Sequence, residues 1–336
     1  MIRRRNVLAA LGASAIGGPA WAQRFQGKEL VAQGFGGPTQ DVLQRVVFDV
    51  FDKREGTRST QVPLQSAAAF ARMRAEAAAP QIDLYQFSGG QERLAAAEGL
   101  TAPLGDLPAL ADVPAKMKAP NWVTFAVIAE GILYRTDKVK TPPRSYKDFL
   151  DPQYDGHIAI PTITNGYGTD FLVMLARAFG GSETNIGPGF DALAKIANGA
   201  AIFRAASEVP GLFAQGDAWI IPYDSTSAKR CKDAGLPVAF VAPEEGSVSS
   251  SCSVCIAAKS KNLDLARAMA AQFIAPESQL AIAEQLQWAP TNAKVQLPET
   301  LAKQLPRPDQ LVTLDMDTMT KSRPQWTERW NREVGR

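Results

Sequence analysis

Residues 28–51 read KELVAQGFGGPTQDVLQRVVFDVF and place an apolar strand pattern directly before a helix pattern. The run KELVAQGF predicts a β-strand. The turn Gly36 to Thr39 then opens a helix, because apolar residues recur along one helical face after it. That face consists of Val42, Leu43, Val46, Val47, Val50 and Phe51.

Two further strand–helix pairs follow this first one. The segments 58–64 (RSTQVPL) and 81–87 (QIDLYQF) predict strands, and 66–79 (SAAAFARMRAEAAA) and 90–99 (GQERLAAAEG) predict helices. Strands that alternate with helices are typical of an α/β fold, with a largely parallel sheet covered on both faces.

The second half of the chain continues the alternation after a proline-rich interval at 103–120. A long β-rich stretch, WVTFAVIAEGILYRTDKV, covers 122–139. Helix and strand patterns then follow at 164–181, 189–200, 208–224 and 225–243, and two helices separated at Pro276 come next. The end of the chain predicts an amphipathic helix with Trp326 and Trp330 at i, i+4.

The first 22 residues are predicted to be a secretory signal peptide. Arg3, Arg4 and Arg5 form a basic start, an uncharged run of small and apolar residues follows, and Ala20-Trp21-Ala22 supplies the cleavage site. The uncharged run is too short to span a membrane. Arg4-Arg5 fits the twin-arginine export route, and the Sec route stays open. We therefore expect a periplasmic protein that is cleaved after Ala22.

The composition of the mature chain limits which functions are expected. The signal holds three of the 36 basic residues and none of the 34 acidic ones, which leaves a net charge near −1. A chain without a strong positive field is not expected to bind nucleic acid or anionic lipid. The 314 residues that remain of 336 exceed the ~250–300 at which a single core stops growing, so two lobes are predicted.

Histidine and cysteine give little sign of chemistry. The single histidine, His157, lies in a predicted turn, so no metal site or cofactor is expected. Cys252 and Cys255 lie three residues apart in the strand pattern SVSSSCSVCIAA and would face opposite sides of it. A disulfide of Cys231 with either of them, and buried free thiols, both remain open.

Four turns that follow predicted strands are the places to look for a ligand. Open α/β sheets bind ligands beyond the carboxyl ends of their strands. These turns are Phe35-Gly36-Gly37, Ser88-Gly89-Gly90, Thr164-Asn165-Gly166-Tyr167-Gly168 and Tyr223-Asp224-Ser225-Thr226. They occur in both halves, and a cleft between two sheets would bring them face to face.

In its order of segments the chain resembles the bacterial extracellular solute-binding proteins of ABC importers, in particular the spermidine/putrescine-binding branch. The resemblance covers most of the mature chain, and no single stretch is a catalytic fingerprint. It is carried by IDLYQFSGGQERLAAAEGLTAPL, ILYRTDKVKTPPRSYKDFLDPQYDGHIAIP, GDAWIIPYDSTSAKRCKDAGLPVAFVAPEEG, NLDLARAMAAQFIAPESQLAIAE and QWTERWNREV.

The resemblance implies a two-lobe periplasmic binding protein fold, similar to type II, with parallel-rich mixed sheets joined by crossover hinge strands. Lobe one would comprise 27–128 and 255–312, lobe two 129–254, and a C-terminal helical segment 313–336. The hinge would lie near 127–130 and 252–256, and closure would trap a small molecule. A monomer would then deliver it to an inner-membrane permease. The chain lacks the G-x-x-x-x-G-K-[ST] motif of the partner ATPase.

Site residues follow from the same resemblance. The polyamine-binding branch pairs aromatic faces with carboxylates, which suits an alkylammonium ion. The aromatic candidates are Tyr85, Tyr167, Tyr223 and Trp288, the acidic ones are Asp224 and Glu130, and the turns add Phe35, Gly36, Ser88, Gly89, Asn165 and Ser225.

Each main candidate also has a structural explanation. Asp224, the best single candidate, stands where a helix N-cap would stand. Glu130 lies in the apolar run FAVIAEGILY and needs a partner or water there, and a hinge or surface position would explain it too. Plain core packing would explain Tyr85 and Trp288.

Alternatives remain open for the class of ligand and for the class of function. The turns are mostly Gly, Ser, Thr and Asn, which suits a small carboxylate, an amino acid derivative or an aminophosphonate. Ferric iron is disfavoured because Pro222-Tyr223-Asp224 offers one tyrosine where related iron binders use a pair. A thiaminase-like enzyme would need a cysteine nucleophile, and a sensor domain would share the same cleft.

Overall fold

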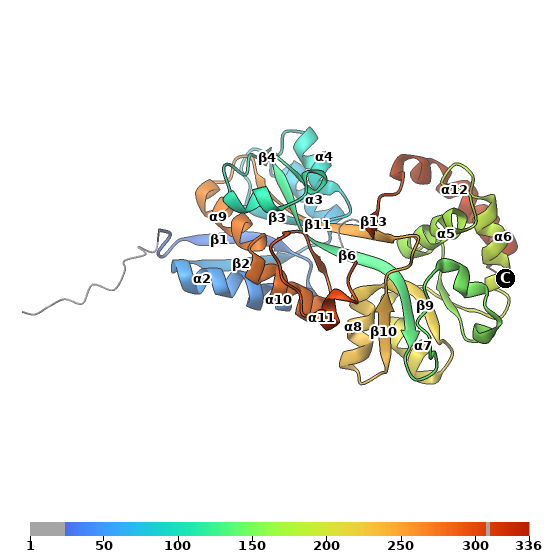
Figure 1. Cartoon of the computed structure of the whole chain (residues 1–336). Coiled ribbons are helices and arrows are strands. Elements are labelled where there is room, and N and C mark those ends of the chain that lie inside the picture. The colour runs from blue at the N-terminus through green and yellow to red at the C-terminus, as the bar shows by residue number, and fades with distance from the viewer. Residues whose placement is uncertain (1–23, 307–309, 336) are drawn as a thin grey trace, which may run out of the picture.

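The computed structural model describes residues 24–306 and 310–335, which form two lobes joined by long strands (Figure 1). The predicted signal peptide lies outside the described residues. In the described part of the chain, no helix has both the length and the apolar character that crossing a membrane requires.

The first lobe begins with the predicted strand–helix series. Strands β1 (Glu29–Gly34), β2 (Arg58–Pro63) and β3 (Leu84–Ser88) alternate with helices, and β1 pairs in parallel with both β2 and β3. The helical stretch after Gly36 comprises α1 (Gly37–Leu43), a π-helical turn (Gln44–Phe48) and α2 (Asp49–Glu55). Helices α3 (Ser66–Ala75) and α4 (Gln91–Ala97) complete the series. The α/β class is confirmed.

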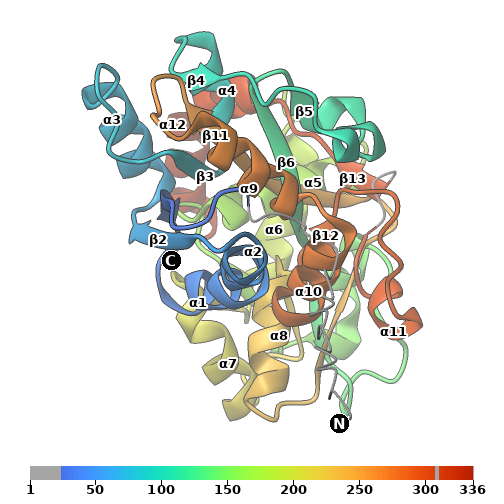
Figure 2. The same cartoon turned by 90° about the vertical axis from the view of Figure 1, so that its left-hand side faces the viewer.

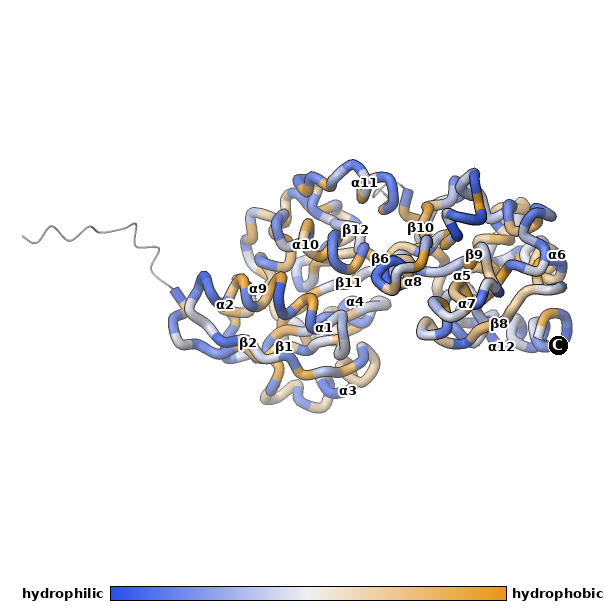
Figure 3. Tube along the Cα trace, turned by 90° about the horizontal axis from the view of Figure 1, so that it is seen from below, coloured by the Kyte–Doolittle hydropathy of each residue, from blue (hydrophilic) through white to orange (hydrophobic). Residues whose placement is uncertain are grey.

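Two long strands connect the lobes and make the sheet mixed. Strands β6 (Trp122–Arg135) and β11 (Ser247–Ala257) pair antiparallel with each other, and β11 also pairs antiparallel with β3. Figure 3 shows β6 and β11 in the middle of the molecule, where the two lobes join. In the second lobe β9 (Ile220–Asp224) and β10 (Val238–Val241) pair antiparallel with β6. The expectation of parallel strands in both halves holds in part in the second lobe: β7 (Ala159–Pro161) pairs in parallel with β8 (Ala201–Phe203), whereas the central strand β6 enters from the first lobe and pairs antiparallel with its neighbours.

The remaining elements lie around these sheets. In the second lobe they are β7 (Ala159–Pro161), β8 (Ala201–Phe203), α5 (Gly166–Ala178), α6 (Gly187–Ile196), α7 (Val209–Gln215), α8 (Ser225–Asp233) and α12 (Met316–Glu333). The others are β4 (Thr101–Ala102), β5 (Lys118–Ala119), α9 (Leu263–Phe273), α10 (Pro276–Leu286), β12 (Ala289–Pro290), α11 (Glu299–Ala302) and β13 (Leu311–Val312). Helices α9 and α10 pack on the π-helical turn between α1 and α2 (Figure 2).

Each lobe has its own apolar core. Phe48, Phe125 and Phe273 are fully buried together in the first lobe. Phe171 and Phe190 are buried together in the second. The change from one core to the other falls between Val127 and Ala129 on β6 and between Val248 and Cys252 on β11. The two cores are thus connected by two strands that belong to both lobes, and hydrogen bonds between the start of α8 and the segment after α10 add a second connection.

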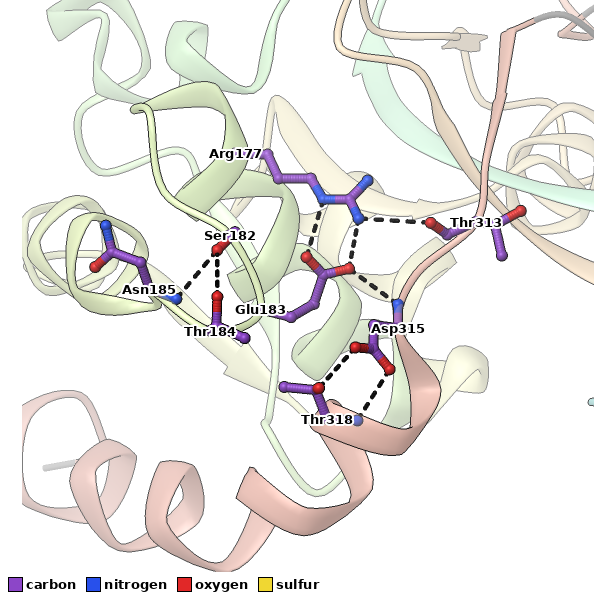
Figure 4. A network of polar contacts seen from close by, with 8 residues as sticks. All are labelled: Arg177, Ser182, Glu183, Thr184, Asn185, Thr313, Asp315 and Thr318. Atoms are coloured by element: carbon purple, nitrogen blue, oxygen red, sulfur yellow. Dashed lines mark hydrogen bonds and ion pairs between the residues drawn. The ribbon is translucent and has the colours of Figure 1, made fainter.

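The C-terminal helix α12 packs on the second lobe. Trp326 and Trp330 are buried in that lobe's core. Figure 4 shows how the helix start is held: Asp315 accepts a hydrogen bond from the Thr318 backbone N–H at 3.1 Å, and its own N–H donates to Glu183 at 3.0 Å. Arg177 pairs with Glu183. The Asp315 N–H and Arg177 outweigh the burial of Glu183 and lower its pKa.

Candidate functional site

Two of the predicted carboxylates lie side by side on neighbouring strands of the second lobe's sheet. Glu130 on β6 and Asp224 at the end of β9 are direct partners in the antiparallel register. Their exposed fractions are 8% and 4%. Side chains directly opposite on antiparallel strands lie ~4.5–5.5 Å apart at Cβ, and like charges there repel. The fold therefore places two buried acids where they destabilise each other unless a proton or a cation intervenes.

Helix α5 brings a third carboxylate to the same place. Asp170 lies one turn after Tyr167, so both side chains share a helix face. Gly168 lets this turn approach the end of β7, because a Cβ there would overlap the Thr162 carbonyl oxygen. Burial, then the Asp170 charge and a hydrogen bond with Asp170, raise the pKa of Glu130 well above its usual value. Burial raises the pKa of Asp170 to about 6.

Asp224 has the capping role that its position suggested. Its carboxylate accepts hydrogen bonds from the Ser227 backbone N–H at 2.7 Å and from the Ser227 hydroxyl at 3.3 Å. Arg230 in turn donates to the Ser227 hydroxyl at 2.7 Å. Burial raises the pKa of Asp224, while the Ser227 N–H and Arg230 oppose the rise. Capping occupies part of the carboxylate and does not exclude a ligand contact.

Two predicted tyrosines form an aromatic wall beside these acids. The rings of Tyr167 and Tyr223 lie 4.3 Å apart between centroids, tilted by 43°. Phe203 packs on Tyr223 at 5.3 Å. Burial and the Asp224 charge raise the pKa of Tyr167, so its hydroxyl stays protonated. Asn165 donates to the Tyr223 hydroxyl at 3.3 Å and caps α5 by accepting from the Tyr167 N–H. Five predicted site residues thus meet: Glu130, Asn165, Tyr167, Tyr223 and Asp224.

The first lobe presents the turn at residues 88–90 near the crossover strands, and the buried carboxyl group of Glu92 follows it in the first turn of α4. The Ser88 hydroxyl hydrogen-bonds the Ser250 hydroxyl on β11 at 3.0 Å, and Ser66 accepts from the Ser88 N–H. Ser250 pairs with Ile128, two residues before Glu130 on β6. Gly89 has a φ of 104°, a conformation that favours glycine.

Ser225 and Trp288 join the lobes through hydrogen bonds, whereas the contacts of Phe35 and Gly36 stay within the first lobe. The Trp288 indole N–H donates to Thr226 at 2.9 Å, and the Ser225 hydroxyl donates to the Gln287 carbonyl at 2.6 Å. Phe35 packs edge-on against Trp288 at 6.3 Å, and the Gly36 N–H donates to Gln40. The start of α8 is thereby attached to the segment after α10, next to Asp224.

Tyr85 lies apart from this group. It is fully buried in the first lobe's core, stacks on Phe87 at 5.6 Å and pairs with Cys255 on β11. Its hydroxyl has no hydrogen-bond partner among the described residues. The structure supports core packing for this residue, which was the alternative to ligand contact.

Two surface cavities lie away from the predicted site, whereas Cys252 pairs with Ser88 and Cys255 with Tyr85 in the register of β3 and β11. Cys231, Cys252 and Cys255 are buried free thiols, so no disulfide joins them. Burial raises the pKa of Cys231 to about 11 and that of Cys252 to about 12. No group of His, Cys, Asp and Glu in the described ranges could hold a metal ion. The cavities, about 400 and 460 Å³, are lined by second-lobe residues that include Phe149 and Tyr154 and none of the candidates.

Sequence reasoning missed Asp170, Tyr146 and Arg323. Tyr146, in the 3₁₀ turn Tyr146–Leu150, is buried with Glu130 and Asp170 near it, and burial followed by their charges raises its pKa. Arg323 on α12 opposes the rise in the pKa of Asp170. The helical spacing from Tyr167 would have pointed to Asp170, whereas nothing local pointed to Tyr146 or Arg323.

Comparison with known protein families identifies one family whose model matches this chain. Residues 47–307 match the family model described as bacterial extracellular solute-binding protein. No curated protein matches the sequence.

Several solved structures share the fold. One is a putative extracellular solute-binding protein from Bordetella parapertussis, 24% identical over 91% of this chain and 98% of that one, with a TM-score of 0.80. An ABC transporter from Clostridium perfringens is 23% identical over 91% and 99%, with a TM-score of 0.73. The protein AgtB from A. tumefaciens R10, in complex with agropinic acid, is 17% identical over 92% and 99%, with a TM-score of 0.64.

Proposed function

The chain belongs to the family of bacterial extracellular solute-binding proteins, and we propose that it is the periplasmic binding component of an ABC importer for a polyamine-like cation. It would hold the solute between its lobes and deliver it to an inner-membrane permease. The proposal that the solute is a cation rests on one observation: Glu130, Asp170 and Asp224 lie near one another beside the Tyr167–Tyr223 wall.

The chemistry of this group suits an amine. Buried carboxylates without a counter-ion are costly, and a bound cation would relieve that cost. The faces of Tyr167 and Tyr223 would attract an alkylammonium ion, at ~0.5–2 kcal/mol for each contact. Arg323 and Arg230 oppose the rise in the pKa values of Asp170 and Asp224, so a bound cation would add to a compensation that these two arginines begin.

Capture between the lobes would use the crossover strands as a hinge. Each lobe has its own core, and β6 and β11 pass from one core into the other. Small backbone changes near 127–130 and 249–252 would therefore rotate one lobe against the other without unpacking either. Because the cores change at these positions, we also propose the lobe boundaries that were predicted from the sequence. The Ser225–Gln287 and Trp288–Thr226 hydrogen bonds also join the lobes and would shift when the lobes rotate.

A solute that also carries a carboxylate is the second candidate. The first lobe's turn at Ser88 and Gly89 offers a hydroxyl group and backbone, and burial raises the pKa of the neighbouring Glu92, so a polar or anionic end would meet little opposing charge there. AgtB, which shares the fold, was solved with agropinic acid. An amino acid derivative would place its amine on the second lobe and its carboxylate on the first.

An enzyme is not favoured. A cysteine nucleophile needs a lowered pKa, and burial raises the pKa of Cys231, Cys252 and Cys255. We propose a binding role without covalent chemistry.

The test is a thermal-shift panel on the mature chain, residues 23–336, followed by calorimetry. Spermidine, 1,4-diaminobutane, 4-aminobutanoate, agropinic acid and fructose 6-phosphate would be compared. A bound solute at about 100 times its Kd stabilises the folded state by about 2.7 kcal/mol, which raises Tm measurably. The proposal predicts that at least one amine-bearing solute raises Tm. A panel in which none of the five solutes raises Tm would contradict it.

A further inference from the structure

Two strands from different lobes end close together beside β6. Strand β9 of the second lobe pairs with β6 as far as Glu130, and β12 of the first lobe pairs with it at Val127 and Ala126. Three positions on a strand span about 10 Å, and within them β6 passes from one core to the other. A rotation of the lobes at this point therefore changes how the end of β9 and the start of β12 lie relative to each other.

The first-lobe side of this place is held by a buried network of hydrogen bonds. The Gln279 side-chain oxygen on α10 accepts the backbone N–H groups of Thr291 and Asn292, both at 2.8 Å, and its nitrogen donates to the Thr291 hydroxyl at 3.1 Å. That hydroxyl donates in turn to the Thr124 carbonyl on β6 at 2.7 Å. All four residues are buried. The segment 287–292 is therefore fixed to the first lobe and moves with it.

Two hydrogen bonds link this segment to the start of α8 in the second lobe. The Ser225 hydroxyl donates to the Gln287 carbonyl at 2.6 Å. The Trp288 indole N–H donates to the Thr226 hydroxyl at 2.9 Å. We call these four residues the interlobe contact. A buried hydrogen bond shifts an equilibrium by about fivefold, so two of them favour the arrangement of the lobes in which both are made.

A third bond extends this link along α8. Lys232 donates to the Gln304 side-chain oxygen at 2.9 Å, and the Gln287 side-chain nitrogen donates to the same oxygen at 2.7 Å. Gln304 follows α11, in a segment that packs on the first lobe's core. Gln287 is thus tied to α8 twice, directly through its carbonyl and through Gln304 by its side chain.

Gln287 itself has a strained conformation. It ends α10 with a φ of 54°, and no other non-glycine residue in the described ranges has a positive φ. Such a conformation costs free energy and persists only where the surroundings impose it. The side-chain oxygen of Gln287 is also buried without a hydrogen-bond partner among the described residues. Both costs weaken the interlobe contact, so it can be released without unfolding either lobe.

We propose that the interlobe contact acts as a releasable latch that holds the two lobes in the arrangement seen in the structure, and that Gln287 is the residue that positions it. Asp224 directly precedes Ser225 and caps α8. The start of α8 is therefore placed by both lobes, and release of the latch would move this helix end relative to the first lobe. The inference concerns the arrangement of the lobes and does not depend on which solute is bound.

The test measures the distance between the lobes in the mature chain without solute. Spin labels on Lys53→Cys in α2 and Asp217→Cys after α7 report this distance by pulsed electron double resonance. Both positions are exposed, whereas the three native thiols are buried and should not react. The double variant S225A/W288F removes both donors of the interlobe contact. We expect the ratio of molecules at other distances to molecules at the native distance to rise at least about fivefold.

Matched variants separate the interlobe contact from a general loss of stability. Ser260→Ala removes a buried hydroxyl that donates to Asp83 at 2.6 Å within the first lobe, and it should leave the ratio unchanged. Thr226→Val and Lys232→Met each remove one bond between the lobes, and each should raise the ratio by about two- to fivefold.

Identical distance distributions for the native chain and S225A/W288F would overturn the proposal. A change in Ser260→Ala as large as that in the double variant would also overturn it. If the double variant does not fold, an unchanged ratio in both Thr226→Val and Lys232→Met would have the same consequence. Because no solute enters the experiment, each of these results would leave the proposed binding function standing.

Discussion

The two lobes offer a ligand very different surfaces. The second lobe contributes three acids and two tyrosines from β6, β9 and α5, whereas the first contributes serine and glycine turns beside an edge-on Phe35–Trp288 pair. The second lobe would therefore decide which charge binds, and the first would decide how the rest of the solute is covered. Predictions that remove one surface at a time can break this division.

The largest effect is expected from Asp224→Asn. Asparagine keeps the side-chain oxygen that caps α8 at the Ser227 N–H, so stability should change little. It removes the charge, so amine affinity should fall by more than about tenfold, as expected when a buried ion pair loses one partner. Calorimetry and thermal melting measure the two effects. A lower Tm with unchanged affinity would make Asp224 a cap only.

The next effect concerns stability in the absence of solute. The pKa values of Glu130 and Asp170 are raised in the folded state, so the folded chain binds more protons than the unfolded chain. The stability that these two groups contribute is fully present below their pKa values in the unfolded chain, which are near 4. It is lost as pH rises through their pKa values in the folded chain. The free energy of unfolding should therefore fall by about 1–3 kcal/mol from pH 5 to pH 8. E130Q should flatten this profile, and a wild-type stability that rises over the same range would contradict it.

A smaller effect is expected where the lobes touch. Trp288→Phe keeps the ring beside Phe35 and removes the N–H that donates to Thr226. Loss of one such bond should lower the free energy of unfolding by about 1 kcal/mol. Affinity for 1,4-diaminobutane should stay within about threefold of the wild type. A larger loss of affinity would show that the contact shapes the acid group.

The smallest effect is expected from the first lobe's turn. Ser88→Ala removes a hydroxyl that bonds Ser250 and leaves the backbone bond from Ser88 N–H to Ser66 in place. Affinity for 1,4-diaminobutane should change by less than about threefold. For 4-aminobutanoate a larger loss would place its carboxylate at this turn. A loss as large as that of Asp224→Asn for the diamine would contradict the division between the lobes.

The sequence predicted most of the elements and part of the site, for physical reasons. Strand–helix periodicity located β1 to α4, and the sequence placed Asp224 where it caps α8, while its contact with a ligand stays a prediction. Periodicity carries no information on strand direction, so the antiparallel role of β6 in the second lobe was missed. It also cannot tell which face of a buried strand meets a ligand, and Tyr85 on β3 faces the core.

The second-lobe site shows the same limit more sharply. Glu130 and Asp224 are 94 positions apart in the numbering and become neighbours only through strand pairing. Tyr146 and Arg323 approach the acids from a 3₁₀ turn and from α12, and no local pattern marks either residue. Asp170 could have been found, because helical spacing links it to Tyr167.

The most direct measurement is a crystal structure of the mature chain with 1,4-diaminobutane. The account predicts one ammonium nitrogen within about 3 Å of carboxylate oxygens of Glu130, Asp170 or Asp224, with the alkyl chain against the Tyr167–Tyr223 wall and the lobes closed around it. A diamine bound only to the first lobe, or in the surface cavity beside Phe149, would contradict it.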